Sequence, residues 1–196
     1  MDSKRKPYIT IGLIVVNVLI FLYLEVIGDT GSSLFMKEHG AMYYGMLADG
    51  VYLPFLSSCF LHFGIRHLAN NMVMLGAAGN ILEDAMGSVK FLILYILAGL
   101  GGSGLSYAMM MQSGTYSVTA GASGAVFGLV GGLVWVVIRH CGRYKTLTGR
   151  GMLVMVALCL YYGVSSVNVD NWGHVGGLIT GFILALLLYR MPDHVV

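Results

Sequence analysis

Residues 121–138 read GASGAVFGLVGGLVWVVI, and residues 172–189 read WGHVGGLITGFILALLLY. Neither stretch contains an Asp, Glu, Lys or Arg, and each is close to the roughly 20 residues that a helix needs to cross the hydrocarbon of a bilayer. Glycines recur every four residues in both: Gly124, Gly128 and Gly132 in the first, and Gly173, Gly177 and Gly181 in the second. Small residues at this spacing allow two helix backbones to approach closely in lipid. We expect these stripes to face each other, the alternative being that they pack against other helices.

The rest of the 196-residue chain has the same character. Apolar residues make up 57% and charged residues only 10%, whereas soluble domains carry about 25% charged residues. With a mean hydropathy of +0.80, the composition excludes a disordered chain. Three cysteines, Cys59, Cys141 and Cys159, are too few for a disulfide scaffold, so we expect them to be free thiols. We predict an all-α, polytopic membrane protein with six transmembrane helices, at residues 8–27, 66–82, 91–111, 117–138, 151–169 and 172–189. The second is the least certain window because its asparagines are costly in lipid unless they face protein.

Positive charge predicts the orientation of the six spans. Nine of the eleven Lys and Arg residues fall on the side of the termini, and only Lys37 and Arg66 fall on the other. Cytoplasmic loops are enriched in Lys and Arg, so both termini should be cytoplasmic. We expect the protein to lie in the plasma membrane. The predicted organisation is a short cytoplasmic N-terminus (1–7), one six-span domain (8–190) and a short cytoplasmic tail (191–196). The long outer connection, residues 28–65, is too apolar for a solvated loop and should lie in the interface or pack on the bundle.

Four polar side chains from three predicted spans lie at one depth, near the outer ends. They are His67, Asn71, Ser123 and His174. A serine becomes a nucleophile when a neighbouring base takes its proton, and imidazole is the commonest base for this step. Asn71, His67 and the backbone N–H of Ser123 could stabilise an oxyanion. Each residue has a simpler interpretation as a packing or interhelical hydrogen-bonding group, and their joint occurrence favours the catalytic one.

No carboxylate is clearly placed to orient His174. Asp170 precedes it by four residues, but a position at a helix start is more typical of a helix cap or a solvated loop residue.

These motifs resemble the rhomboid family of intramembrane serine proteases, in the six-span bacterial form. The resemblance covers nearly the whole chain and is carried by the following elements: Gly121-Ala122-Ser123-Gly124, His67 with Asn71, His174-Val175-Gly176-Gly177 with Gly181, and Gly79, Glu83 and Gly87. It implies a Ser123–His174 dyad, with Ser123 as nucleophile, His174 as base and then acid, and Asn71 with His67 as oxyanion stabilisers. It also implies supporting roles for Gly121, Gly124, Phe127 and Gly177, with the Phe127 ring against the histidine. The Trp-Arg pair that the family often has in its first outer loop is missing around Tyr52-Leu53-Pro54.

The resemblance implies cleavage of other proteins' transmembrane segments near their outer ends. Because helical carbonyls are already hydrogen-bonded, the substrate must unwind locally, so we expect Gly, Pro or other helix-weakening residues near the cut, and a small residue just before it. Water would reach Ser123 through an outward cavity roofed by residues 163–171, and the family leads us to expect substrate entry between spans two and five. The partners expected are transmembrane substrates and the lipid bilayer, with no cofactor, metal or nucleic acid. Two alternatives remain: a catalytically silent rhomboid-like binding fold, and a small transporter.

Overall fold

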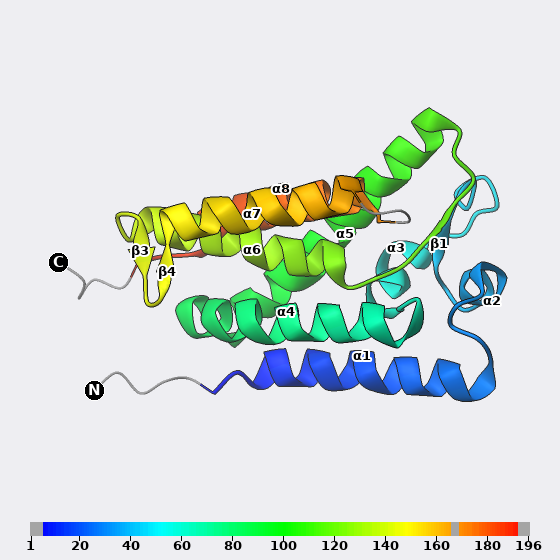
Figure 1. Cartoon of the computed structure of the whole chain (residues 1–196), viewed down its shortest axis with the longest axis horizontal. Coiled ribbons are helices and arrows are strands. Elements are labelled where there is room, and N and C mark those ends of the chain that lie inside the picture. Colours follow the sequence, from blue (N-terminus) through cyan, green and yellow to red (C-terminus); the bar gives the residue numbers. More distant parts are fainter. Residues whose placement is uncertain (1–5, 166–168, 192–196) are drawn as a thin grey trace.

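The structure, a computed structural model, describes residues 6–165 and 169–191, and this part of the chain is mostly helical (Figure 1). It contains six helices of 17 residues or more: α1 (Tyr8–Ile27), α4 (Gly64–Met86), α5 (Ser88–Ser113), α6 (Ser123–Arg139), α7 (Gly149–Ser165) and α8 (Asn171–Leu188). Shorter elements connect them: α2 (Ser33–Glu38), α3 (Pro54–Ser57), the 3₁₀ turn η1 (Ser58–Phe60), and two antiparallel strand pairs, β1 (Met42–Tyr43) with β2 (Val118–Thr119) and β3 (Arg143–Tyr144) with β4 (Leu147–Thr148).

The all-α membrane architecture is confirmed, and the number of crossings remains a prediction. In the described part of the chain, α1, α5 and α8 are long and apolar enough to span a bilayer. Helices α6 and α7 are apolar but shorter, and α4 is long but more polar, as expected from its asparagines. The predicted window at residues 117–138 is wrong at its start, because residues 118–119 form β2 and the helix begins at Ser123. The predicted window at residues 151–169 includes residues 166–168, which lie outside the described part.

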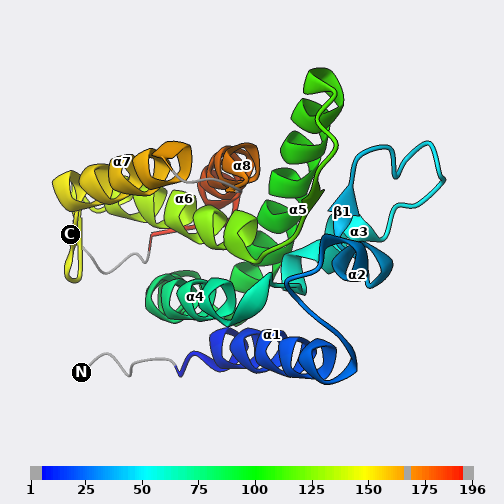
Figure 2. The same ribbon diagram turned by 45° about the vertical axis from the view of Figure 1, so that its right-hand side comes forward.

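Helix α6 occupies the middle of the bundle. It packs against α4, α5, α7 and α8, while α1 lies on the far side of α4 (Figure 2). The largest fully buried side chains of the central core include Leu75 and Leu82 of α4, Leu94 and Tyr95 of α5, and Leu129 of α6. A functional group at the start of α6 is therefore surrounded by protein.

Glycines bring α6 and α8 into backbone contact. A Cβ added to Gly177 would lie 1.9 Å from the carbonyl oxygen of Gly124, and one added to Gly181 would lie 2.0 Å from that of Gly128. The predicted face-to-face packing is thus confirmed for these pairs. It is wrong for Gly132, whose side faces Leu82 and Leu94. Because a helix turns once in 3.6 residues, the contact stripe shifts by a three-residue step, and Gly131 faces α8 instead. A Cβ added to Gly131 would lie 2.1 Å from the Leu178 carbonyl oxygen.

The long connection between α1 and α4 packs on the bundle, as predicted. Met36, Met42 and Met46 are fully buried, and Met42 and Met46 pack with Tyr107 of α5. Strand β1 also pairs with β2, which directly precedes the site helix α6. We call the end of the bundle that holds this connection the loop end (Figure 1).

A buried carboxylate attaches α1 to the rest of the molecule. Glu83 of α4 accepts hydrogen bonds from the N–H groups of Ile9 and Thr10 at 3.0 and 2.8 Å, from the Thr10 hydroxyl at 2.8 Å and from the Ser88 hydroxyl at 2.7 Å. The residue before α1, Pro7, makes no side-chain cap. The first N–H groups of a helix have no partner within it, so Glu83 supplies from another helix what α1 lacks locally.

The cysteines are thiols wherever they are described. Cys59 is buried and Cys141 exposed, both without a disulfide. The side chain of Cys159 lies outside the described part.

Candidate active site

Ser123 is the first residue of α6, held in place by the segment before it. The Gly121 N–H donates to the carbonyl of Ser58 at 2.9 Å, and the Ala122 N–H donates to Nε2 of His62 at 3.4 Å. Gly121 has a φ of +152°, and a Cβ there would lie 2.8 Å from the His67 ring and 3.5 Å from the Ser123 hydroxyl. This contact gives a physical reason for glycine at position 121, and it places the His67 ring beside the serine.

His62 is a site residue that the sequence reasoning did not single out. Its side chain is 1% exposed, and its ring lies 5.2 Å from the His67 ring in an edge-on arrangement. Burial, together with a smaller effect of the neighbouring His67, lowers the pKa of His62 to about 3. The ring is therefore neutral at ordinary pH and free to accept the Ala122 N–H. The signal available in the sequence was an isolated histidine within an apolar run, which is costly to bury without a partner.

His174 lies in the first turn of α8 and is buried. Its ring stacks on Phe127 of α6, with centroids 4.2 Å apart and planes 6° from parallel. The aromatic neighbour that the sequence led us to expect is therefore present. One turn separates Phe127 from Ser123 along α6, so the stack also holds the imidazole near the start of that helix.

Asp170 caps α8, as predicted. Its carboxylate accepts the Gly173 N–H at 2.9 Å and the hydroxyl of Ser106, from α5, at 2.5 Å. Among the residues that the structure describes, Nδ1 of His174 is buried without a hydrogen-bond partner. Asp170 thus fixes the start of α8 and does not bond the imidazole, and within the described residues Nδ1 of His174 has no orienting carboxylate.

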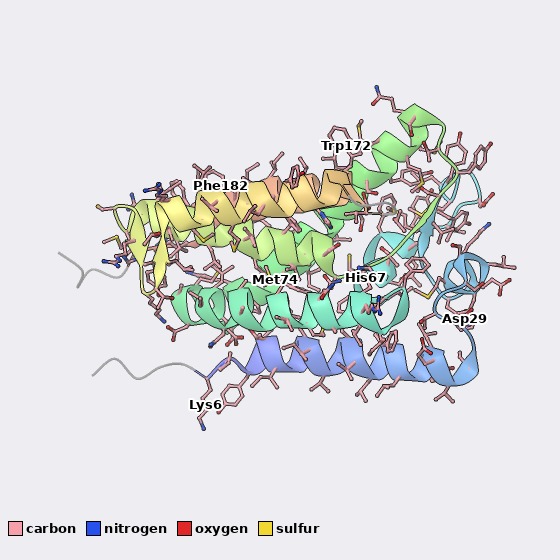
Figure 3. The ribbon with its side chains drawn as sticks, viewed as in Figure 1. Lys6, Asp29, His67, Met74, Trp172 and Phe182 are labelled. Carbon is pink, nitrogen blue, oxygen red and sulfur yellow. The ribbon has the colours of Figure 1, made fainter. Side chains whose placement is uncertain are left out.

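His67 and Asn71 lie four residues apart near the start of α4, and Figure 3 shows His67 at the loop end. The Asn71 side-chain amide uses one of its two N–H groups to donate a hydrogen bond to the His67 carbonyl at 3.1 Å. The Asn71 side chain is buried.

A cavity of about 1890 Å³ joins these groups. Its lining includes five side chains that were predicted from the sequence: His67, Asn71, Ser123, Phe127 and His174. Residues 169–171, part of the predicted roof, also line it, while residues 166–168 lie outside the described part. The predicted supporting glycines Gly124 and Gly177 lie at the α6–α8 contact just beneath.

A second cavity, of about 30 Å³, lies behind Ser123. Its polar lining includes Ser58, Ser103 and Asp170. This is room for about one water molecule, which needs two to four polar partners. Sequence reasoning did not find Ser58 or Ser103, because a serine in an apolar helix is also a common packing residue.

The fold and the site define a helical membrane protein in which a half-buried serine and a buried histidine, from neighbouring helices, line one cavity. A family model described as Rhomboid domain matches residues 49–191. The chain is 34% identical over 186 residues to the rhomboid protease GluP of Bacillus subtilis, covering 95% of this chain and 36% of GluP. It is 36% identical over 166 residues to RHOMBOID-like protein 4 of Arabidopsis thaliana (83% of this chain, 41% of that protein), and 25% identical over 199 residues to the rhomboid protease GlpG of Serratia proteamaculans (99% and 67%).

This chain belongs to the rhomboid family. It spans between about a third and a half of the length of GluP and most of the plant relatives it matches.

Proposed function

We propose that this protein is an intramembrane serine endopeptidase that cleaves transmembrane segments with a Ser123–His174 dyad. The observation that carries the proposal is the shared cavity: Ser123 and His174 come from two helices in backbone contact, and both side chains line one cavity with Asn71 and His67. Membership of a family that includes named proteases supports the same activity.

In the proposed reaction, the Ser123 hydroxyl oxygen attacks the carbonyl carbon of a peptide bond while Nε2 of His174 takes its proton. The tetrahedral intermediate collapses, the C–N bond breaks, and the leaving amine takes the proton from His174. Water then attacks the acyl-enzyme, with His174 again as base, and releases the acid and free Ser123. The Phe127 stack supports this role because it restrains the ring without consuming a ring nitrogen.

Three donors stabilise the oxyanion in this proposal. The N–H of Ser123 is among the first N–H groups of α6, which lack partners within the helix. The Asn71 amide has a second N–H beyond the one bonded to the His67 carbonyl. The His67 ring lies beside Gly121 and the serine. Donors fixed in a water-poor site stabilise developing charge without reorganising, which is worth about 2.7–4 kcal/mol for one donor in a soluble serine protease.

The substrate in this proposal is a transmembrane segment that unwinds near its outer end, at helix-weakening residues, with a small residue before the cut. Met74 of α4 and Leu158 of α7 both line the cavity, which supports entry between the second and fifth spans. A stiff poly-Leu span should be cleaved far more slowly than a matched span containing Gly and Pro, and equal rates would contradict this substrate preference.

We further propose six crossings, with both termini cytoplasmic in the plasma membrane. The start of α1, the end of α8 and the β3–β4 hairpin lie at one end of the bundle, opposite the loop end (Figure 1). That hairpin carries Arg143 and Lys145, and Lys145 pairs with Asp84 of α4. This distribution agrees with cytoplasmic enrichment of positive charge.

The experiment is labelling of purified protein with a fluorophosphonate probe, read by intact mass, beside cleavage of a Gly-containing transmembrane substrate. We expect one adduct and cleavage with the parent, and neither with Ser123→Ala or His174→Ala. Ser88→Ala, at the opposite end of the bundle, should keep the adduct. A folded parent that gives neither adduct nor cleavage would refute the protease and favour a silent binding fold.

A further inference from the structure

Charge is unevenly distributed at the loop end. The acidic side chains there outnumber the basic ones, five to two: Glu25, Asp29, Glu38, Asp49 and Asp170 against Lys37 and Arg66. The lining of the large cavity reverses this balance, because it contains both cations and, of the five carboxylates, Asp170 alone.

The carboxylates outside the lining have local partners or face solvent. Asp29 accepts the Gly31 N–H, and Asp49 accepts the Tyr43 hydroxyl. Asp170, which is in the lining, is already bound by two donors at the α8 cap. In the described part of the chain, none of these carboxylates forms an ion pair with Lys37 or Arg66. Within residues 6–165 and 169–191, the one ion pair is Lys145–Asp84, at the other end of the molecule.

Helix stability does not explain Arg66. It lies in the first turn of α4, where the N–H groups make the helix end partly positive and favour acidic residues. That turn contains no acidic residue, and the Arg66 side chain is exposed. A cation at this position costs a little helix stability, so its presence at the cavity edge calls for another reason.

Lys37 is held at the same cavity by a different contact. Its ammonium lies 4.2 Å from the centroid of the Tyr43 ring, and Tyr43 also lines the cavity. A cation over an aromatic face keeps its charge available to a further partner on the open side. Two helices, α2 and α4, thus each present one cation to the space in which Ser123 and His174 lie.

We infer that Lys37 and Arg66 select substrates whose chain carries Asp or Glu next to the cut transmembrane segment, on the loop-end side. This inference rests on the proposed protease function and specifies its substrate class. A carboxylate on the emerging chain would pair with the Lys37 ammonium as a point charge, and with the Arg66 guanidinium through two parallel hydrogen bonds. A basic flank at the same place would be repelled by both.

The test uses the full chain in a neutral detergent with three substrates that share one Gly-containing span. Their flanks beyond the cut carry Asp-Asp, Asn-Asn or Lys-Lys. We expect kcat/KM to fall in that order, with about a tenfold difference between the acidic and basic flanks, because each partly exposed charge pair contributes a few-fold. The difference should shrink as salt is raised from about 0.05 M to 0.5 M, since exposed charges are screened.

Charge reversal provides the decisive variant. The double variant Lys37→Glu with Arg66→Glu should prefer the basic flank, while Glu38→Gln, which changes a charge on the same helix as Lys37 but outside the lining, should keep the parent's order. Equal cleavage of the three substrates, or an unchanged order in the double variant, would overturn the inference.

A binding measurement separates this inference from the catalytic proposal. Affinity of the same three substrates for Ser123→Ala should follow the same order whether or not the parent cleaves. Acidic preference in binding without cleavage would refute the protease alone. Cleavage with no preference in rate or binding would refute the charge selection alone.

Discussion

Replacing Gly177 by alanine should separate α6 from α8 and disable the site. The new Cβ would lie 1.9 Å from the Gly124 carbonyl oxygen, and that oxygen belongs to a helix backbone that cannot rotate away as a side chain would. The helices must move apart by about 1.5 Å to restore an ordinary van der Waals distance. Overpacking a close contact typically costs 1–3 kcal/mol, and we expect about 3 kcal/mol because the neighbouring Gly128–Gly181 contact also loosens.

The same displacement should reduce catalysis. Ser123 directly precedes Gly124, and His174 lies one turn before Gly177, so the movement separates the two reacting groups. A misplacement of about 1 Å can cost a hundredfold in rate. We therefore expect fluorophosphonate labelling of Gly177→Ala to be slowed by more than tenfold.

Two measurements test this prediction. Stability is measured by unfolding in mixed micelles titrated with a denaturing detergent, and the rate of fluorophosphonate labelling is measured separately under native conditions. Gly104→Ala is the matched control: Gly104 lies within α5, and a Cβ there meets nothing within 4 Å. Its stability should equal or exceed that of the parent by up to about 1 kcal/mol, because alanine is the better helix former. If Gly177→Ala were as stable and as reactive as Gly104→Ala, the role assigned to the backbone contact would be refuted.

Three further predictions follow from the contacts described above. Glu83→Ala should lower the unfolding free energy by about 3 kcal/mol in the same titration, because it leaves the buried Thr10 donors unpaired; no change would show that α1 is held by apolar contacts alone. The pKa of His62 is about 3 in the folded state, which is below its unfolded value of about 6.5. The neutral ring should therefore stabilise the fold above about pH 6.5. Below that pH, the unfolding free energy should fall by up to about 1.4 kcal/mol per pH unit. His62→Gln should flatten this acid limb, and an unchanged limb would reject the assignment. Phe127→Ala should slow labelling about tenfold or more, because the His174 ring loses its stacking partner. Phe127→Tyr retains an aromatic ring and should label at close to the parent's rate. An equal loss of labelling rate in both variants would argue against a stacking role.

The sequence predicts the helices well and their ends less well. Long apolar windows locate α1 and α8 to within a residue, because a bilayer tolerates few other structures there. The start of α6 was misplaced by six residues. The segment before Ser123 is apolar enough for a helix, but pairing of β2 with a strand 76 residues earlier holds it extended. Pairing at such a separation leaves no periodic signal in a single sequence.

The candidate site divides in the same way. Ser123, His174 and Asn71 were found because polar side chains are conspicuous in apolar helices, and Phe127 followed from the family resemblance. His62 and the Ser106 contact with Asp170 were not found, since each works through a partner 60 or more residues distant. The glycine stripes correctly paired α6 with α8 but failed at Gly132, where the choice between three- and four-residue steps depends on how the two helices cross.

The Glu83 attachment has a consequence for biosynthesis. The start of α1 leaves the ribosome before α4, and the carboxylate that accepts its Thr10 N–H lies 73 residues further along the chain. At about 5–20 residues per second, α1 waits several seconds or longer in the bilayer before that acceptor is made. Docking of α1 is therefore a late step of assembly, completed only after α4 has been inserted, and a cell has an interval in which this nascent helix is open to other membrane proteins.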